Sequence, residues 1–449
     1  PDYAVTGVQT CALPIYQHIG FKPANLANGE ILIENKYAFL PLDEFDFTWE
    51  VTGDGKSVTS GKLPIISAAP GEVGQAKMDI NIQPEPGTQY FLNVKAIQKD
   101  TKGLIETGWI AAQEQFELPF ARPATTIQSS TFGQVSANIE GTKVTVSGSD
   151  FTVVFEAGAG LMTSYKKGNT EFLQSGPVPN FWRAPIDNDF GNGLHRRSGI
   201  WRKAGETRKV RDINVSQPAP NLAKVTLIFD LVNPEGENIA EYTSTYTVYG
   251  SGDIQVDNHF KMTKENLPEI VRMGMNLVMP RSFEQMTWLG RGPHESYRDR
   301  KTSAFVGLYK GSVADQYWAY IRPQENGNKT DVRWVTITDA AGNGLLFKGL
   351  PMLEVSAHHN ILEDFESSGP TVGWIQQGVK SRHTTDVKPR DLTSVNIDYG
   401  QMGVGGDDSW GARTHTQYRL TEREYKYSFL ICQVNAGDNL TEKGLEVIQ

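Results

Sequence analysis

Phe45-Asp-Phe-Thr-Trp-Glu-Val51 decides the fold class of this chain, because apolar and polar side chains alternate along it without interruption. A period of two residues is the pattern of a β-strand with one buried face. Residues 30–35 alternate in the same way, and residues 89–97 and 109–116 supply two further strand-like segments. Strands of this length, with turns between them, predict an immunoglobulin-type β-sandwich over residues 17–118.

The rest of the chain, residues 125–435, predicts a second and larger domain that is again almost all strand. Only residues 199–203 and 361–366 could form short helical turns. So many strands with so few helices must build two packed antiparallel sheets or a barrel. The fold class is therefore all-β, and the strand–helix units of a parallel (β/α)₈ barrel are not expected here. The main strand candidates are residues 138–146, 151–156, 223–231, 241–248, 253–262, 332–339 and 344–348.

Three short segments lie outside the two predicted domains. Residues 1–16 have neither the basic start nor the apolar centre of a signal peptide, and they resemble translated sequencing-adapter sequence. We expect them to be foreign or disordered, and we expect a larger upstream part to be missing. Residues 119–124 are predicted to be a linker, and residues 436–449 a tail.

The composition is that of a soluble globular protein with an acidic balance of charge. The 449 residues carry a formal net charge of -9, which argues against nucleic acid and against an anionic membrane surface as partners. No apolar run approaches the length of a membrane span. The two cysteines, Cys11 and Cys432, predict neither a disulfide framework nor a metal site. They leave the compartment open between cytoplasm and periplasm.

The glycine-rich stretch 399–411 reads Tyr-Gly-Gln-Met-Gly-Val-Gly-Gly-Asp-Asp-Ser-Trp-Gly and separates two apolar, strand-like runs. So many glycines exclude a helix and predict a loop with unusual backbone angles. Asp407, Asp408 and Trp410 lie at its far end. An indole beside carboxylates can hold a sugar, with the apolar ring face on the indole and the hydroxyls on the carboxylates. The alternative is a hairpin whose tryptophan fills the core.

Arg183 and the trio Asp187, Asn188 and Asp189 form the first of three polar clusters that strand alternation does not explain. Clustered oxygen ligands suit a calcium ion, but the spacing lacks the rest of an EF-hand loop. We therefore favour a structural network in which Arg183 is bonded to carboxylates across a domain joint.

The second cluster is the loop of residues 288–300, which carries Arg291, His294 and Glu295 between glycines and a proline. A salt-bridged corner is the favoured interpretation, and a functional site is the alternative. The third cluster, residues 320–327, is a proline-stiffened loop whose amide and carboxylate side chains suit hydroxyl recognition or a solvated turn.

Four segments occur in order along the chain and together resemble the C-terminal part of the large family 2 β-galactosidases. The resemblance covers nearly everything after residue 17. It implies the sandwich that follows the catalytic barrel in that family, and then a large antiparallel β-supersandwich. The segments are Phe181-Trp-Arg-Ala-Pro-Ile-Asp-Asn-Asp-Phe-Gly191, Gly290-Arg-Gly-Pro-His-Glu-Ser-Tyr-Arg-Asp-Arg300, Arg322-Pro-Gln-Glu-Asn-Gly327 and Met402-Gly-Val-Gly-Gly-Asp-Asp-Ser-Trp410.

The resemblance implies hydrolysis of terminal β-D-galactosides such as lactose, with retention, by two glutamates on a (β/α)₈ barrel. This chain does not contain that barrel, so no catalytic residue is expected in it and the chain alone is expected to be inactive. The magnesium and sodium ligands of the family belong mostly to the same missing domain. We therefore expect no metal or cofactor site in this chain. The expected partners are the barrel domain and further copies of the complete enzyme.

The resemblance also assigns substrate contacts to the closing domain. Trp410 matches a tryptophan in the wall where the leaving sugar stacks, and Asp408 lies beside it. Residues 192–198, which contain His195, match a mobile loop beside the substrate pocket. Arg183, Arg291 and their neighbours in the two charged segments are expected to support these loops or the joint between domains.

Two other interpretations stay open. The chain could be a free-standing carbohydrate-binding protein with two β-sandwich modules, or a separately encoded small subunit that complements a large one. The DNA upstream of codon 17 separates these cases, because a barrel-encoding frame favours the enzyme fragment and a promoter favours the binding module.

Overall fold

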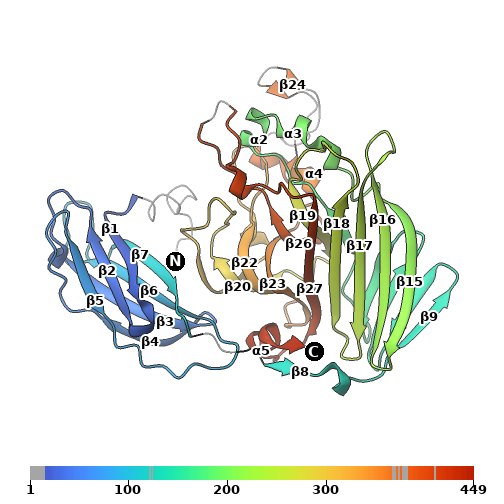
Figure 1. Ribbon diagram of the computed structural model, residues 1–449, viewed down its shortest axis with the longest axis horizontal. Coiled ribbons are helices and arrows are strands. Elements are labelled where there is room, and N and C mark those ends of the chain that lie inside the picture. Colours follow the sequence, from blue (N-terminus) through green and yellow to red (C-terminus); the bar gives the residue numbers. More distant parts are fainter. Residues whose placement is uncertain are drawn as a thin grey trace. The chain divides into compact units, whose positions relative to one another are not determined.

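The computed structural model describes residues 16–120, 123, 125–366, 371–372, 375–376, 383–408 and 411–449. The chain divides into two units. Unit 1 runs to Thr126 and also contains Lys301–Leu308 and Leu445–Val447, and unit 2 contains the remainder. Strands predominate in both units, so the predicted all-β fold class is confirmed (Figure 1). No helix within the described residues is long and apolar enough to cross a membrane.

Unit 1 is built from two antiparallel sheets whose inner faces share one hydrophobic core (Figure 1). Ile31 and Ile33 from one sheet are buried in the same cluster as Phe47 and Val94 from the other. Fully burying one such side chain contributes about 1.5–3 kcal/mol. The first sheet contains, in order, β1 (Ile19–Asn25), β2 (Glu30–Asn35) and β5 (Val73–Lys77), and the second contains β4 (Lys56–Lys62), β3 (Phe45–Gly53), β6 (Tyr90–Gln98) and β7 (Ile110–Glu117).

Unit 2 contains a five-stranded sheet and nearly all of a twelve-stranded sheet, of which residues 305–308 are grouped with unit 1. Both sheets are antiparallel in every pair of strands described. The small sheet has the order β13 (Thr170–Glu171), β12 (Leu161–Lys167), β11 (Phe151–Glu156), β10 (Lys143–Ser147) and β9 (Ser136–Glu140). The main path of the large sheet is β14 (Ser175–Asn180), β19 (Arg272–Met279), β26 (Thr393–Gln401), β23 (Gly344–His358), β27 (Glu424–Val434), β18 (Ile254–Met262), β17 (Asn238–Tyr249), β16 (Leu222–Val232) and β15 (Lys209–Ala219). Off this path lie β20 (Gln285–Gly292), β21 (Phe305–Ser312) and β22 (Lys329–Thr338).

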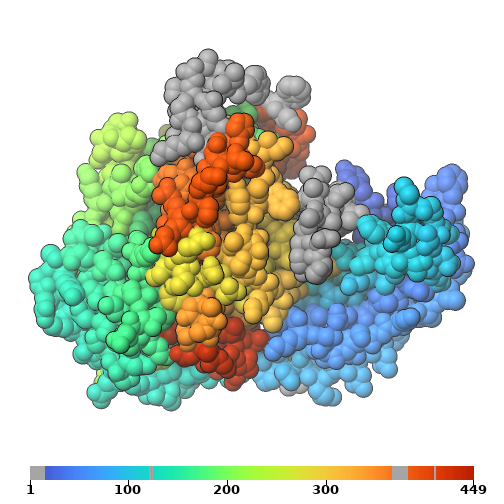
Figure 2. All heavy atoms as spheres, turned by 180° about the vertical axis from the view of Figure 1, so that it is seen from behind, coloured from blue at the N-terminus to red at the C-terminus, as the bar shows by residue number. Residues whose placement is uncertain are grey.

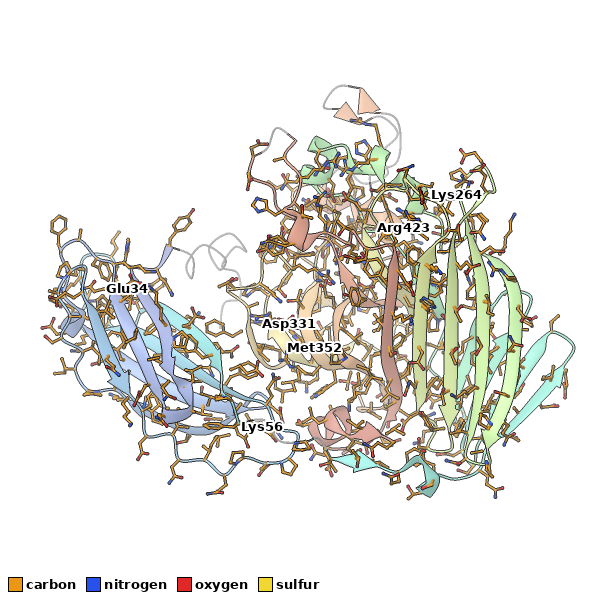
Figure 3. All side chains as sticks on the ribbon, viewed as in Figure 1. Glu34, Lys56, Lys264, Asp331, Met352 and Arg423 are labelled. Carbon is orange, nitrogen blue, oxygen red and sulfur yellow. The ribbon has the colours of Figure 1, made fainter. Side chains whose placement is uncertain are left out.

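The core of unit 2 lies between these two sheets. Phe155 of β11 meets Tyr246 of β17 edge to face, with ring centroids 5.1 Å apart. Both side chains belong to one large buried cluster that draws on both sheets. In the space-filling view, the teal residues of the small sheet form one flank of unit 2 (Figure 2). Figure 3 shows side chains on both faces of the strands in each unit, because successive residues of a strand point to opposite faces of its sheet.

Some elements differ from the expectations. Residues 138–146 do not form one strand, because Gly141 at φ +60° turns the chain between β9 and β10. The short helices α2 (Asp187–Gly191) and α3 (Leu194–Arg197) occupy a segment that carried no helical pattern. Helical turns do form where they were expected, at Gly199–Trp201 and in α4 (Leu362–Phe365). The final residues, expected to be a tail, include α5 (Leu440–Leu445) and β28 (Val447–Ile448).

Strands β14, β19 and β26 position the candidate site. Asn180, Gly274 and Asp398 lie in one row across these three strands, since Asn180 pairs with Gly274 and Gly274 pairs with Asp398. β14 and β26 both run antiparallel to β19, so their C-terminal ends lie at the same end of the sheet. Two of the sequence motifs begin directly after these strand ends.

Candidate functional site

The described parts of the four motifs meet in unit 2, although about 200 residues separate the first motif from the last in the sequence. We call residues 183–197, 291–300, 320–327, 402–408 and 411–415 the motif cluster. Its helices α2 and α3 lie at one end of the large sheet (Figure 1). The motif after β14 meets the motif after β26 because those strands end side by side. The other two motifs meet because β20 ends where its antiparallel partner β22 begins.

Arg183 is the central tie of the motif cluster, and its side chain is fully buried. Its Nε and Nη2 atoms donate to the two carboxylate oxygens of Asp189 at 3.1 and 3.0 Å. Nη1 and Nη2 also donate to the backbone oxygens of Met402 and Gly403, at 2.5 and 3.0 Å. Burial alone lowers the pKa of Arg183, but the Asp189 carboxylate outweighs burial and holds the pKa above its usual range. One guanidinium thus ties the start of α2 to the glycine-rich loop.

Asp187, Asn188 and Asp189 point to three different partners and do not converge on one ion. Asp189 accepts from Arg183 and also from the backbone N–H of Ile186 at 3.1 Å. The exposed Asp187 binds Arg322 at 3.1 Å. The Asn188 side chain donates to the backbone oxygen of Val404 at 3.0 Å. Every one of these partners belongs to unit 2, so the network that was expected across a domain joint lies within one unit.

The carboxylates of the motif cluster are engaged by protein donors within the described residues. No group of three or more His, Cys, Asp or Glu side chains among them is placed to hold a metal ion. The carboxylates of the motif cluster are instead held by arginines and backbone N–H groups, which would compete with a cation for the same oxygens.

Asp299 holds the glycine-rich loop from the other side. Its carboxylate accepts from the backbone N–H groups of Val404 and Gly405 at 3.0 and 2.6 Å. A Cβ atom at Gly403 would lie only 2.5 Å from the Asp299 carboxylate. The loop therefore needs glycine at this position, because any side chain would push the carboxylate away. Arg183 donates to backbone carbonyl oxygens of the loop, and Asp299 accepts from its backbone N–H groups.

Glu295 fixes the second and third motifs to each other. One of its oxygens accepts from both Arg300 and the Tyr320 hydroxyl, and the other accepts from the backbone N–H of Gly327 at 2.8 Å. Burial, together with the nearby cations Lys329 and Arg300, lowers the pKa of His294 to about 4, so this histidine is neutral at neutral pH. Arg291 binds Asp331 at 2.5 Å; Asp331 is labelled in Figure 3.

Two of the three residues assigned to substrate contact, His195 and Asp408, lie within the described part of the motif cluster. His195 lies on α3, and its ring is 5.0 Å from the ring of Phe190. Burial and the neighbouring Arg196 lower the pKa of His195. Asp408 is exposed and accepts from the backbone N–H of Ala412 at 3.2 Å. Trp410 lies outside the described residues.

Sequence reasoning missed a buried charge network behind the motif cluster. Arg272, only 1% exposed, donates to Glu325 at 2.8 Å and lies 3.2 Å from Asp398. Burial raises the pKa of Asp398 to about 8; Arg272 opposes this shift, while the like charges of Glu354 and Glu325 add to it. The available signal was an arginine and an aspartate inside apolar strand segments, where a charge is rare unless it is paired.

Comparisons with known proteins agree with this architecture. The family described as "Beta galactosidase small chain" matches residues 147–431, and the one described as "Beta-galactosidase, domain 4" matches residues 31–119. A β-galactosidase of Priestia megaterium is 36% identical over 420 residues, which are 93% of this chain and 38% of that protein. A β-galactosidase of Alteromonas mediterranea is 28% identical over 446 residues, 93% of this chain and 40% of that protein. The chain thus spans about two fifths of the length of these relatives.

Proposed function

This chain belongs to the β-galactosidase small-chain family, and from that membership we propose that it is the C-terminal part of an enzyme that hydrolyses terminal β-D-galactosides such as lactose. In the proposed reaction the anomeric configuration is retained, through a covalent glycosyl-enzyme intermediate. The two carboxyl groups that such a reaction needs would come from a barrel domain outside this chain. We assign no catalytic residue to the 449 residues themselves.

The role that we propose for unit 2 is to form the wall on which the leaving sugar rests. Asp408, His195 and Trp410 would contribute to that wall. The supporting observation is the tie made by Arg183, which binds the start of α2 and the glycine-rich loop at once. The segment that carries His195 and the loop that carries Asp408 are therefore held at the same edge of one sheet. A wall that is ordered before the substrate arrives costs less conformational entropy on binding.

The test of this function uses the complete reading frame that contains residues 17–449. We expect the purified protein to hydrolyse 2-nitrophenyl β-D-galactoside and to release β-galactose first, as followed by NMR before the anomers equilibrate. Release of α-galactose first would overturn retention. A complete protein that binds galactosides without cleaving them would favour the carbohydrate-binding alternative.

The role of the wall is tested separately in that complete protein. Trp410→Ala should weaken binding of the leaving sugar by about 1–3 kcal/mol, the scale for losing a buried aromatic face. The measurement is the capture of the galactosyl-enzyme by glucose as an acceptor. Trp109→Ala, at an exposed tryptophan of unit 1, is the matched control. Unchanged capture in Trp410→Ala would remove the indole from the wall.

A further inference from the structure

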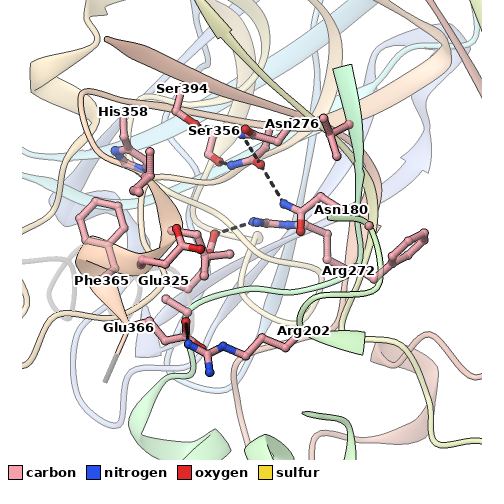
Figure 4. Close-up of a pocket in the computed structure, with 18 of the residues that line it drawn as sticks. Asn180, Arg202, Arg272, Asn276, Glu325, Ser356, His358, Phe365, Glu366 and Ser394 are labelled. Atoms are coloured by element: carbon pink, nitrogen blue, oxygen red, sulfur yellow. Dashed lines mark hydrogen bonds and ion pairs between the residues drawn. The ribbon is translucent and has the colours of Figure 1, made fainter. Parts of the chain in front are cut away.

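Unit 2 contains a cavity of about 280 Å³ that the proposed function does not use (Figure 4). One wall comes from β14, β19, β23 and β26, and another comes from α4 and the residues around Arg202. The volume lies near the lower end of the range of about 300–1,000 Å³ that is typical of ligand pockets. It is therefore suited to a ligand of the size of one sugar ring.

The strand wall presents two serine hydroxyl groups whose oxygen atoms are held by amide donors. Asn396 donates to the hydroxyl oxygen of Ser356 at 3.0 Å, and Asn276 donates to that of Ser394 at 2.9 Å. Asn180 in turn donates to the side-chain oxygen of Asn396 at 3.1 Å. Each serine hydroxyl accepts from an amide, and within the described residues neither hydroxyl proton has an acceptor. Both are left to donate to a ligand in the cavity.

The cavity also offers carboxylate acceptors whose charges are already balanced. One oxygen of Glu325 accepts from Arg272 and Gln401, and its other oxygen has no partner within the described residues. Glu366 binds Arg202 at 2.6 Å on the opposite side (Figure 4). Because each carboxylate is paired with an arginine, the site favours a neutral ligand that can accept and donate hydrogen bonds.

An apolar surface and an opening complete the site. The ring of Phe365 lines the cavity. It is stacked on the ring of Tyr317, with the two ring centroids 5.7 Å apart, and this contact fixes the orientation of the Phe365 ring. At the rim, Lys203 is exposed and binds both Glu206 and Glu363, at 2.9 and 3.0 Å. The rim is thus in contact with solvent, while the hydroxyls and carboxylates lie inside.

From these observations we propose that this cavity binds a single neutral monosaccharide ring. A pyranose has an apolar face that matches the phenyl ring of Phe365. Its hydroxyls both donate and accept, which matches the serine hydroxyls and the free oxygen of Glu325. The arrangement is ordered by contacts inside the protein, so little side-chain entropy would be lost when the sugar binds.

The experiment titrates the 449-residue chain with D-galactose and D-glucose, with isothermal calorimetry and ligand-observed NMR as readouts. We expect at least one sugar to bind, and Glu325→Gln to lower the affinity at least about tenfold through loss of a charged acceptor. Ser356→Ala should lower it about three- to tenfold and leaves the charge network intact. Glu424→Gln, at an exposed glutamate, is the matched control and should change nothing.

Three results would overturn the site. The first is that neither sugar binds to a chain whose thermal unfolding is normal. The second is that the wild type and Ser356→Ala bind the sugar with equal affinity and are both folded. The third is loss of affinity in Asp408→Ala but not in Glu325→Gln or Ser356→Ala, which would place the sugar on the loop. The readout is binding by this chain alone, so the cavity stands or falls independently of hydrolysis by the complete protein.

Discussion

At the scale of single residues, the buried charges of unit 2 decide how its stability depends on pH. Asp398 keeps its proton in the folded state up to a pKa of about 8, whereas in the unfolded chain it loses the proton near 3.8. Between these values the folded state binds more protons than the unfolded state, so stability falls as pH rises. The stabilising contribution is complete below pH 4 and is lost as pH approaches 8.

Asp398→Asn should remove this dependence, because asparagine resembles the protonated acid and does not titrate. Relative to the wild type, the variant should gain roughly 4 kcal/mol in its free energy of unfolding between pH 5 and pH 8. Urea denaturation at several pH values measures this difference. Asp46→Asn, at an exposed carboxylate of unit 1, should follow the wild type at every pH. Parallel curves for Asp398→Asn and the wild type would contradict the assignment.

Arg183 shows how much depends on a buried partner. Arg183→Leu leaves the carboxylate of Asp189, which is 3% exposed, without its counter-charge, and should lower the free energy of unfolding by about 3–5 kcal/mol. Arg211→Leu breaks a pair with Asp230 near the surface and should cost no more than about 1 kcal/mol. Urea titrations of both variants at one pH give the comparison. Equal losses would mean that burial does not set the strength of the Arg183 tie.

At the scale of elements, the glycine-rich loop depends on close approach to Asp299. Gly403→Ala brings a methyl group to about 2.5 Å from that carboxylate, which must then release the N–H groups of Val404 and Gly405. We expect a loss of about 1–3 kcal/mol in the free energy of unfolding. Gly199→Ala is the control, because nothing lies within 4 Å of a Cβ atom there. An unaffected Gly403→Ala variant would show that the loop is free to move away.

The elements themselves were predictable to different degrees. β3 follows from alternation, because its buried face is apolar at every second residue. β17 follows the same pattern, with Ser244 as the polar exception on its buried face. α2 was not predictable, since its five residues Asp-Asn-Asp-Phe-Gly carry no helical period. Its acidic first turn is held by Arg183, which the sequence pattern does not place inside the fold. The cavity was equally hidden, because Asn180, Asn276 and Asn396 belong to three strands and only pairing brings them together. The sequence could predict which segments were polar, but not that four of them meet in the motif cluster.

At the scale of the whole molecule, the activity is expected to depend on a domain outside this chain. We predict that the isolated 449 residues hydrolyse no chromogenic β-galactoside, because the two carboxyl groups of the proposed reaction would lie elsewhere. The assay compares the isolated chain with the complete protein at equal molar concentration. Heat-denatured chain is the control for hydrolysis without an enzyme. Turnover that a mechanism-based inhibitor of retaining galactosidases abolishes would contradict this prediction.

The row Asn180, Gly274 and Asp398 across three hydrogen-bonded strands fixes the roots of two loops about 10 Å apart. Main-chain hydrogen bonding between the strands sets that spacing, so it does not depend on the residues of either loop. Residues 192–198 could thus be lengthened, shortened or exchanged by an engineer without shifting where the neighbouring loop starts. Recognition of different sugars could be redesigned there while the underlying sheet is left alone.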